Sequence, residues 1–380
     1  MLTATAQPKI KNKIFFPNLD GLRFFCFISV FLYHSFATNI QYISNDPIYR
    51  AVKYGLFGNG FLGVNFFFVL SGFLITYLLL KEKLKYGKIH VGSFYIRRIL
   101  RIWPLFYLSV AFGFLIFPIL KSHFGETPNE HANVLAYIFL VNNFDFIHTQ
   151  PDASNLSVLW SVAIEEQFYL VWPLIIALIP TKYLNRVFLS IITASLIFRV
   201  INSGNENVLN FHTLSCISDM TIGGLAAYYI ISNSSFRQKI EGLNKWVIVC
   251  VYVAIAVIFL TRQIVFSLIP SLERLVISIL FALVILEQCY SKNSFYKMGR
   301  LTNVSQLGKY TYGLYCLHMI GILAGHTILT KFGLNNTTVK LIFTEGALTL
   351  LITLVLAFVS YHLMEKRFLK LKEKFAFIKT

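Results

Sequence analysis

The feature that most constrains the fold of this chain is a series of uncharged apolar segments, each long enough to cross a membrane. Residues 61–80, FLGVNFFFVLSGFLITYLLL, form one such segment of 20 residues. About 20 apolar residues in a helix span the hydrocarbon core of a bilayer. Comparable segments recur along the chain, so we predict an all-α, polytopic transmembrane helical bundle of about ten spans. The predicted spans lie near residues 22–40, 61–80, 102–120, 156–180, 187–203, 208–231, 245–261, 272–290, 310–330 and 341–363.

Composition supports a membrane protein and argues against a nucleic-acid partner. Charged residues make up 13% of the chain, against about 25% in globular proteins, and the mean hydropathy is +0.64. The net charge of +17 comes from basic residues in short loops between apolar segments, a distribution that membrane insertion produces. The five cysteines lie within apolar segments without metal-ligand or disulfide spacing, so we predict no metal site.

Lysine and arginine counts predict the topology. The segment ANVLAYIFLVNNF, residues 132–144, has only 13 residues and suits a re-entrant or buried segment better than a span. If it does not span and the N-terminus is cytoplasmic, cytoplasmic segments hold 26 of the 34 basic residues; if it spans, the split is 16 inside and 18 outside. The positive-inside rule favours the first arrangement. We therefore predict both termini in the cytoplasm, no cleaved signal peptide, and one domain, residues 1–380, in the cytoplasmic (inner) membrane.

Two adjacent carboxylates occur within the predicted span 156–180. Glu165 and Glu166 point about 100° apart on a helix, so both can hardly face one partner. Ser161, Glu165 and Tyr169 are spaced four residues apart and form one polar stripe. Because ionisable groups in hydrocarbon are costly, they indicate function, and we predict that Glu165 faces the interior. The alternative is a buried carboxylate that holds two helices together.

A histidine, His34, lies deep in the first predicted span. That span and the span 156–180 run in opposite directions, and the helical rise places His34 and Glu165 at similar depth. A histidine and a carboxylate at matched depth can form a base and its orienting partner. The alternative for a lone intramembrane histidine is an interhelical hydrogen bond.

Three arginines, Arg97, Arg98 and Arg101, lie at the cytoplasmic entrance of the third predicted span. Arg98 and Arg101 share a helical face, and guanidinium groups suit phosphate oxygens. The alternative is a topology anchor against lipid headgroups. The lysine-rich loop 81–88 already supplies topology charge, which favours a binding role for the arginines.

Other polar residues within the spans are weaker candidates. Asp219 lies beside Gly223 and Gly224, which favour close helix packing, and we interpret it as structural. His318 either lines the same cavity as Glu165 or bonds a neighbouring helix. The candidate cavity-lining residues are Asp20, Ser71, Trp160, Ser161, Tyr169, Asp219 and His318.

The segments that carry these residues resemble the signature segments of the acyltransferase-3 family, integral membrane acyltransferases that modify bacterial surface carbohydrates. The resemblance covers about residues 17–368. Its final segment, MEKRF, lacks the proline of the family's usual ending. The matching segments, in order, are NLDGLRFFCFISVFLYHS, FFFVLSGFLIT, FYIRRILRIWPLFY, LWSVAIEEQFYLVWPL and YGLYCLHM.

The resemblance implies roles for individual residues. Arg23 and His34 match the family's Arg-x10-His pair, in which the histidine is catalytic. Arg98 and Arg101 match its Arg-x-x-Arg motif, which is associated with the acyl-coenzyme A donor. Glu165 and Glu166 match its paired glutamates. No permanently bound cofactor is implied. The co-substrate would be an acyl-coenzyme A, with acetyl-coenzyme A the expected form.

The predicted reaction moves an acyl group from cytoplasmic acyl-coenzyme A to a hydroxyl of an extracytoplasmic or lipid-linked glycan. His34 would remove the hydroxyl proton or carry the acyl group, and Glu165 would orient it. Trp160 and Tyr169 would stack on sugar rings. Many relatives carry an added extracytoplasmic domain, so this chain would act without one or with a separate transferase. The alternatives are a transporter or flippase without acyl chemistry, and an acyltransferase acting on a lipid or peptide.

Overall fold

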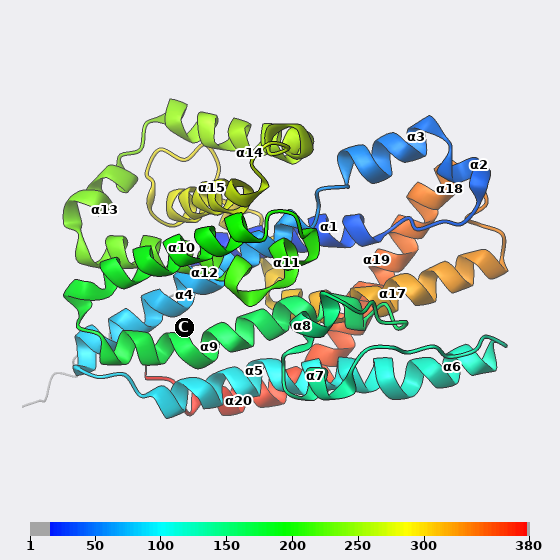
Figure 1. The fold of residues 1–380 in the computed structure, drawn as a ribbon, viewed down its shortest axis with the longest axis horizontal. Coiled ribbons are helices and arrows are strands. Elements are labelled where there is room, and N and C mark those ends of the chain that lie inside the picture. Colours follow the sequence, from blue (N-terminus) through cyan, green and yellow to red (C-terminus); the bar gives the residue numbers. More distant parts are fainter. Residues whose placement is uncertain (1–15, 378–380) are drawn as a thin grey trace, which may run out of the picture.

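The computed structural model describes residues 16–377, and this part of the chain is helical without a strand. The long helices run side by side along the longest axis of the molecule (Figure 1). The helices are α1 (Pro17–His34), α2 (Gln41–Ser44), α3 (Pro47–Arg50), α4 (Leu62–Tyr86), α5 (Val91–Ala111), α6 (Phe117–His123), α7 (Val134–Ile138), α8 (Asn142–Phe146), α9 (Trp160–Leu178), α10 (Leu184–Ile201), α11 (Glu206–Phe211), α12 (Thr213–Ser232), α13 (Ser234–Glu241), α14 (Lys245–Val265), α15 (Pro270–Tyr290), α16 (Thr302–Leu307), α17 (Thr311–Lys331), α18 (Thr338–Lys340), α19 (Gly346–Ser360) and α20 (Lys366–Glu373).

Within residues 16–377, eight helical segments are long and apolar enough to cross a membrane. This confirms the all-helical, multi-span prediction at a coarser level than the predicted ten spans. The other two predicted spans coincide with α1 and α15, neither of which is among the eight. The eight segments are Leu62–Tyr86, Val91–His123, Leu156–Leu178, Thr181–Ile201, Glu206–Ser232, Lys245–Val265, Thr302–Lys331 and Thr338–Glu373.

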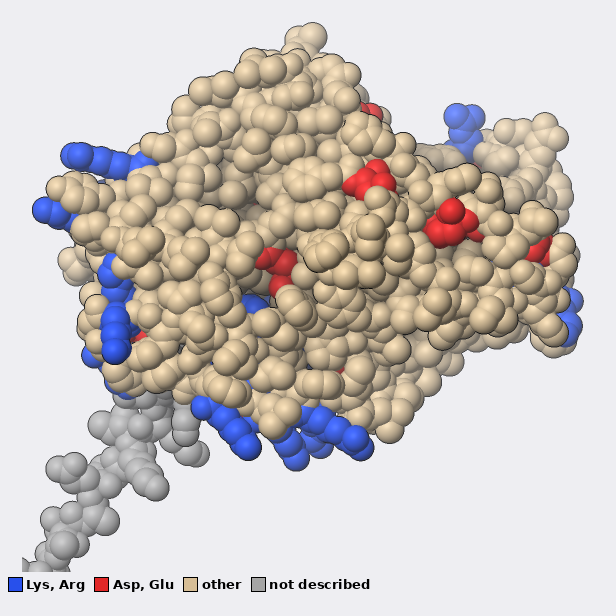
Figure 2. Space-filling view, turned by 60° about the horizontal axis from the view of Figure 1, so that its bottom comes forward, with Lys and Arg blue, Asp and Glu red and all other residues tan. Residues whose placement is uncertain are grey.

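The predicted position of both termini in the cytoplasm concerns residues 1–15 and 378–380, which lie outside the described part of the chain. Figure 2 shows Lys and Arg side chains gathered mainly along the left and lower edges of the view, while most of the visible face carries neither sign of charge. An uneven distribution of this kind suits a protein that is embedded in a bilayer with its basic loops on one side.

The segment 132–144 does not form a spanning helix. It folds as two five-residue helices, α7 and α8. Leu140, between them, has a positive φ of 57°, a left-handed conformation that no α-helix continues through. Leu140 is nonetheless buried, so the segment packs against the bundle through a few of its residues and does not cross as a single helix.

The helix that forms the third predicted span starts earlier in the structure than the sequence predicts. The helical segment runs over Val91–His123, not 102–120, so Arg97, Arg98 and Arg101 lie within its first three turns. The polar residues of 91–101 lowered the local hydropathy, but Phe94 is buried in the core and fixes this part of the helix against the bundle. The helix therefore carries the arginines into the protein rather than ending before them.

The centre of the bundle is the close crossing of α4 and α12. A Cβ atom on Gly72 would lie 1.8 Å from the carbonyl oxygen of Met220, so only glycine permits this approach. Asp219, also on α12, is fully buried and pairs with Arg274 of α15, with 2.7 Å between Oδ2 and Nη2. Asn65 donates a further hydrogen bond to Oδ2 at 3.2 Å. This confirms Asp219 as structural and corrects its place among the cavity-lining candidates, because its carboxylate turns toward α15.

Candidate active site

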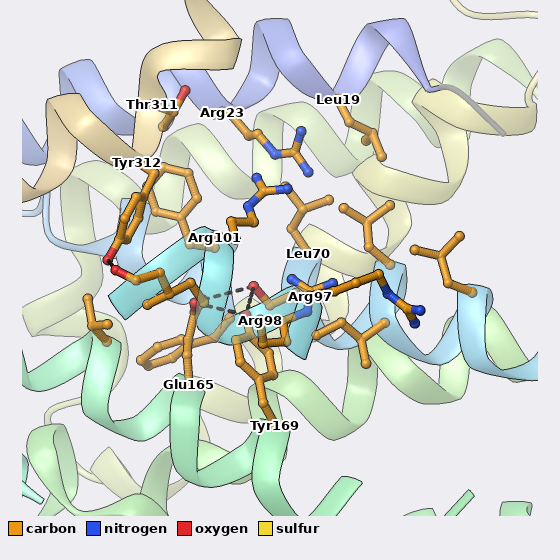
Figure 3. Close-up of a pocket in the computed structure, with 18 of the residues that line it drawn as sticks. Leu19, Arg23, Leu70, Arg97, Arg98, Arg101, Glu165, Tyr169, Thr311 and Tyr312 are labelled. Carbon is orange, nitrogen blue, oxygen red and sulfur yellow. Dashed lines mark hydrogen bonds between the residues drawn. The ribbon is translucent and has the colours of Figure 1, made fainter. Parts of the chain in front are cut away.

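An elongated cavity of about 340 Å³ lies between α1, α4, α5, α9 and α17. Val64 and Glu82 both line it; they are 18 residues apart on α4, which corresponds to about 27 Å along a helix. Cationic side chains from four separate elements reach the cavity, and Figure 3 shows Arg23 of α1 pointing toward Arg101 of α5. The cationic lining residues are Arg23, Arg97, Arg98, Arg101, Lys309 and Lys372.

The arginines of α5 differ in how many hydrogen-bond acceptors and carboxylates already contact their guanidinium groups. Arg97 donates to the carbonyl oxygen of Phe375 at 2.6 Å and lies 3.8 Å from a carboxylate oxygen of Glu82. Arg98 packs its guanidinium over the ring of Tyr169, 5.1 Å from the centroid, and its Nε is buried without a partner. Within residues 16–377, no carboxylate oxygen lies within 4 Å of Arg98 or Arg101. The cavity therefore holds positive charge that an anion can neutralise.

The first helix contributes a paired arginine. Arg23 forms an ion pair and hydrogen bond with Asp20, one turn earlier on α1. Both residues line the cavity, as predicted for Asp20. Because the Asp20 carboxylate holds the Arg23 guanidinium from one side, the remaining donors of the fork stay available to a ligand.

The paired glutamates point in different directions, as their spacing predicted. Glu165 lines the cavity and accepts hydrogen bonds from Ser71 at 2.8 Å and Tyr169 at 2.9 Å (Figure 3). Glu166 is not part of the lining; it accepts a hydrogen bond from the indole of Trp103 at 2.9 Å. The structure thus brings Glu165 together with Ser71 and Tyr169 at the cavity. Glu166 lies on a different face of α9, against Trp103 and outside the cavity lining.

The predicted direct pair of Glu165 with His34 is wrong. Glu165 accepts its hydrogen bonds from Ser71 and Tyr169, and His34 is not part of the cavity lining. Helical rise fixed their depth but not the direction of either side chain. His34 ends α1 and lies instead beside His318 of α17, with 5.3 Å between ring centroids.

A tyrosine of the cavity wall lies against His318, one of the two histidines. Tyr315 lines the cavity, its hydroxyl lies 2.6 Å from that of Ser161, and it donates to the carbonyl oxygen of Val158 at 3.0 Å. Its ring centroid is 5.8 Å from that of His318. Ser161 lines the cavity as predicted, whereas His318 lies behind Tyr315 and outside the lining. The Ser161–Tyr315 contact is thus part of the cavity wall, and His318 packs against the Tyr315 ring without lining the cavity itself.

Two aromatic residues that were predicted to stack on sugar rings are engaged within the protein. Tyr169 is buried, with its hydroxyl on Glu165 and its ring under Arg98. Trp160 is outside the cavity lining and packs against Phe68 and Phe211, with centroid distances of 6.0 and 4.9 Å. Tyr169 is therefore a positioning group for Glu165 and Arg98, which corrects the stacking prediction for this residue.

Several residues that line the cavity were not predicted from the sequence. Tyr315 lies one helical turn before His318, a spacing that could have singled it out. Lys309 and Lys372 carried no such signal, because the segments near residues 309 and 372 reach the cavity only through the packing of α17 and α20. No group of three or more His, Cys, Asp or Glu residues suited to a metal ion occurs in the described part of the chain.

These features define a class: a polytopic helical membrane protein with a cationic cavity that leads toward a pair of histidines. The family model described as an acyltransferase domain matches residues 16–362. The chain belongs to this family, the acyltransferase-3 family.

Similar curated proteins are bacterial O-acetyltransferases. O-acetyltransferase OatA of Staphylococcus aureus (strain NCTC 8325 / PS 47) is 36% identical over 213 residues, 54% of this chain and 31% of that protein. Peptidoglycan O-acetyltransferase OatA of Listeria monocytogenes is 33% identical over 167 residues, which cover 43% of this chain and 24% of that protein. YrhL of Bacillus subtilis, which is named as a proposed peptidoglycan O-acetyltransferase, is 26% identical over 376 residues. These residues cover 94% of this chain and 55% of YrhL. The chain thus spans about half the length of these relatives or less. No solved structure matches it.

Proposed function

We propose that this protein is a membrane O-acyltransferase that moves an acetyl group from acetyl-coenzyme A to a hydroxyl of a bacterial surface glycan, with peptidoglycan as the acceptor. The observation that carries the proposal is the elongated cavity with uncompensated arginines along one part and the Ser161–Tyr315 contact at another. Membership of the acyltransferase-3 family and the names of its relatives agree with acyl transfer to a glycan.

The donor would enter from the cytoplasm at the end of α4 that carries the lysine-rich loop 81–88. Glu82, Arg97 and Lys372 line the cavity there, and Val64 lies at the opposite end. Coenzyme A carries several phosphates on a thin pantetheine arm. Guanidinium forks of Arg98 and Arg101 would bind the phosphates, and the arm would extend along α4 toward Val64.

The chemistry would take place near His34, where α1 meets the start of α4. The ring of Tyr33 packs against Phe61, 5.6 Å between centroids, which places the end of α1 beside residues 61–64. His34 would take the proton of the acceptor hydroxyl as its oxygen bonds to the acyl carbon and the thioester C–S bond breaks. The thiolate of coenzyme A would then take that proton from the imidazolium. The acceptor would approach from the extracytoplasmic side, directly or delivered by a separate transferase.

The proposal is tested with purified protein and radiolabelled acetyl-coenzyme A, together with mass spectrometry of cell-wall glycans from cells with and without the protein. We expect donor binding, and acetyl esters on the glycan that disappear when the protein is absent. His34→Asn should insert and bind donor but lose transfer by about a hundredfold or more, the usual scale for a general base. The matched control is His326→Asn on α17, because His326 pairs with Glu345, away from the cavity.

Two results would overturn the proposal. Native protein that binds no coenzyme A thioester and leaves the glycans unchanged would favour a transporter or flippase. Native protein that transfers acetyl only to a lipid or a peptide would keep the enzyme class and remove the glycan acceptor.

A further inference from the structure

We infer that His318, and not Glu165, is the residue that orients His34 for acyl transfer, by accepting a hydrogen bond from the His34 imidazole at its own Nε2. This inference rests on the proposed function and names a positioning residue within it. It would place a histidine dyad next to the cavity, in which His34 takes the substrate proton and His318 fixes the tautomer of His34.

The hydrogen bonding of His318 fixes its own tautomer. Nδ1 lies 2.6 Å from the carbonyl oxygen of Tyr315, one turn earlier on α17. A carbonyl oxygen only accepts, so Nδ1 carries the hydrogen and Nε2 carries a lone pair in the neutral ring. His318 is fully buried, and its Nε2 has no hydrogen-bond partner in the described part of the chain. A buried acceptor without a hydrogen bond is costly, so Nε2 of His318 can gain stability by accepting a hydrogen bond from a nearby donor.

His34 is the neighbour that can supply this donor. Three aromatic rings lie near the ring of His318. The distances between ring centroids are 6.2 Å for Phe27, 5.8 Å for Tyr315 and 5.3 Å for His34. Phe27 has no polar hydrogen, and the Tyr315 hydroxyl donates to Val158. Of the three rings, His34 has the nearest centroid and is the one that can offer an N–H, so we assign it as the donor to the unpaired nitrogen.

The backbone on both sides of the dyad is held in place. Lys53 donates to the carbonyl oxygens of Tyr33 and Ser35 at 2.7 and 2.5 Å, on either side of His34. On α17, a Cβ atom on Gly321 would lie 2.2 Å from the Thr353 hydroxyl oxygen, so α17 and α19 are locked together just past His318. Fixed backbones leave side-chain rotation as the motion that forms the hydrogen bond, which is what a preorganised site requires.

The proton balance of the reaction is then complete. One nitrogen of His34 takes the proton of the acceptor hydroxyl while the carbon–oxygen bond forms and the carbon–sulfur bond breaks. The other nitrogen keeps its hydrogen, which is donated to Nε2 of His318 throughout. The thiolate leaving group takes the proton from His34, and His318 ends the cycle unchanged. Because the hydrogen bond strengthens as positive charge develops on His34, it favours the transition state over the ground state.

Two substitutions of His318 separate orientation from packing. The amide of asparagine reaches the position of Nδ1, so His318→Asn keeps a donor to Tyr315 and removes the distal acceptor. The longer side chain of His318→Gln can place an oxygen acceptor near the position of Nε2. We expect His318→Asn to lower kcat by about tenfold to hundredfold, by analogy with the loss seen when the hydrogen-bond partner of a metal-bound imidazole is removed. The KM for acetyl-coenzyme A should stay unchanged, and His318→Gln should regain a large part of kcat.

The control is His326→Asn, the same substitution eight residues further along α17. Its ring binds Glu345 at 3.0 Å and is about two-fifths exposed, and we expect native kcat. A kcat of His318→Asn within twofold of native would overturn the inference, as would equal losses in the asparagine and glutamine variants. If native protein transfers acetyl while either of these results holds, the proposed function stands and only this inference fails.

A measurement on the native protein tests the dyad without any destabilising change. Nitrogen-15 spectra of histidine-labelled protein in lipid nanodiscs report the tautomer of each ring, with assignment from His34→Asn and His318→Gln. We expect His318 as a neutral ring with hydrogen on Nδ1, and a His34 signal that shifts when His318 is replaced. Hydrogen on Nε2 of His318, or a His34 signal indifferent to residue 318, would overturn the inference.

Discussion

Two groups of arginines lie within the helical bundle, and they differ in how their charge is satisfied. Arg274 pairs with the buried carboxylate of Asp219, and Arg199 donates to the carbonyl oxygens of Ser271, Pro270 and Leu209. Both arginines are at most 5% exposed. In contrast, Arg98 and Arg101 line a cavity and have no carboxylate within 4 Å among the described residues. The same residue type thus stabilises the fold at one place and provides a binding surface at the other.

The largest expected effect lies in the first group. Arg274→Ala leaves the Asp219 carboxylate buried and without its ion partner, and removal of one member of a buried pair costs about 3–5 kcal/mol. We expect a lower yield of folded protein and a markedly lower thermal unfolding temperature in detergent. The acyl donor should still protect whatever protein remains folded. An Arg274→Ala protein with native unfolding temperature would contradict the structural role of this pair.

The second group should show the opposite behaviour. Arg98→Ala and Arg101→Ala each remove a charge-assisted contact worth about 1.5–3 kcal/mol, so each should weaken acetyl-coenzyme A binding by about tenfold to hundredfold. The unfolding temperature should change little, because neither residue has a carboxylate partner to leave unpaired. Isothermal titration calorimetry on the purified variants measures the affinity. Native donor affinity in the double variant would reduce these arginines to topology anchors.

The sequence anticipated those parts of the site that local periodicity determines. The 100° step of a helix separated Glu165 from Glu166 correctly, and the Arg98–Arg101 spacing placed both on the cavity side. Pairings between helices were not accessible in this way. Depth along the bilayer suggested that Glu165 reaches His34, but depth fixes neither the lateral position nor the rotation of a helix. Tyr315 occupies the space toward His318, as only the packing of α17 reveals.

The same reasoning explains where the fold was predicted well and where it was not. Hydropathy identified the long helices, because their composition alone determines them. It placed the start of α5 too late, because a helix whose polar face lines a cavity scores as less apolar than one that faces lipid. It also gave no sign that the segment after α19 returns to the cavity, where Lys372 contributes to the lining.

Arg97 tests an intermediate case between the two groups. Its guanidinium already donates to the Phe375 carbonyl and lies near Glu82, so less of its charge is free for a ligand. We expect Arg97→Ala to weaken acetyl-coenzyme A binding by only about threefold, the scale of a partly screened ion contact. Titration calorimetry beside Arg98→Ala gives the comparison. A loss in Arg97→Ala as large as in Arg98→Ala would show that existing partners do not predict which arginines bind the donor.

The smallest expected effect concerns Lys372, whose flexible side chain lines the cavity from α20 without a carboxylate within 4 Å in the described chain. Lys372 is half-buried, and the part of its charge that solvent reaches is screened over about 8 Å at physiological ionic strength, so we expect its contact to contribute about 1 kcal/mol at most. Lys372→Ala should therefore weaken donor binding by about two- to fivefold at low salt and by less at high salt. The matched control is Lys370→Ala, two residues earlier on the same helix, exposed and outside the lining. Equal losses in both variants would mean that α20 attracts the donor through its overall charge, and that the cavity distinguishes its ligands only through the arginines of α1 and α5.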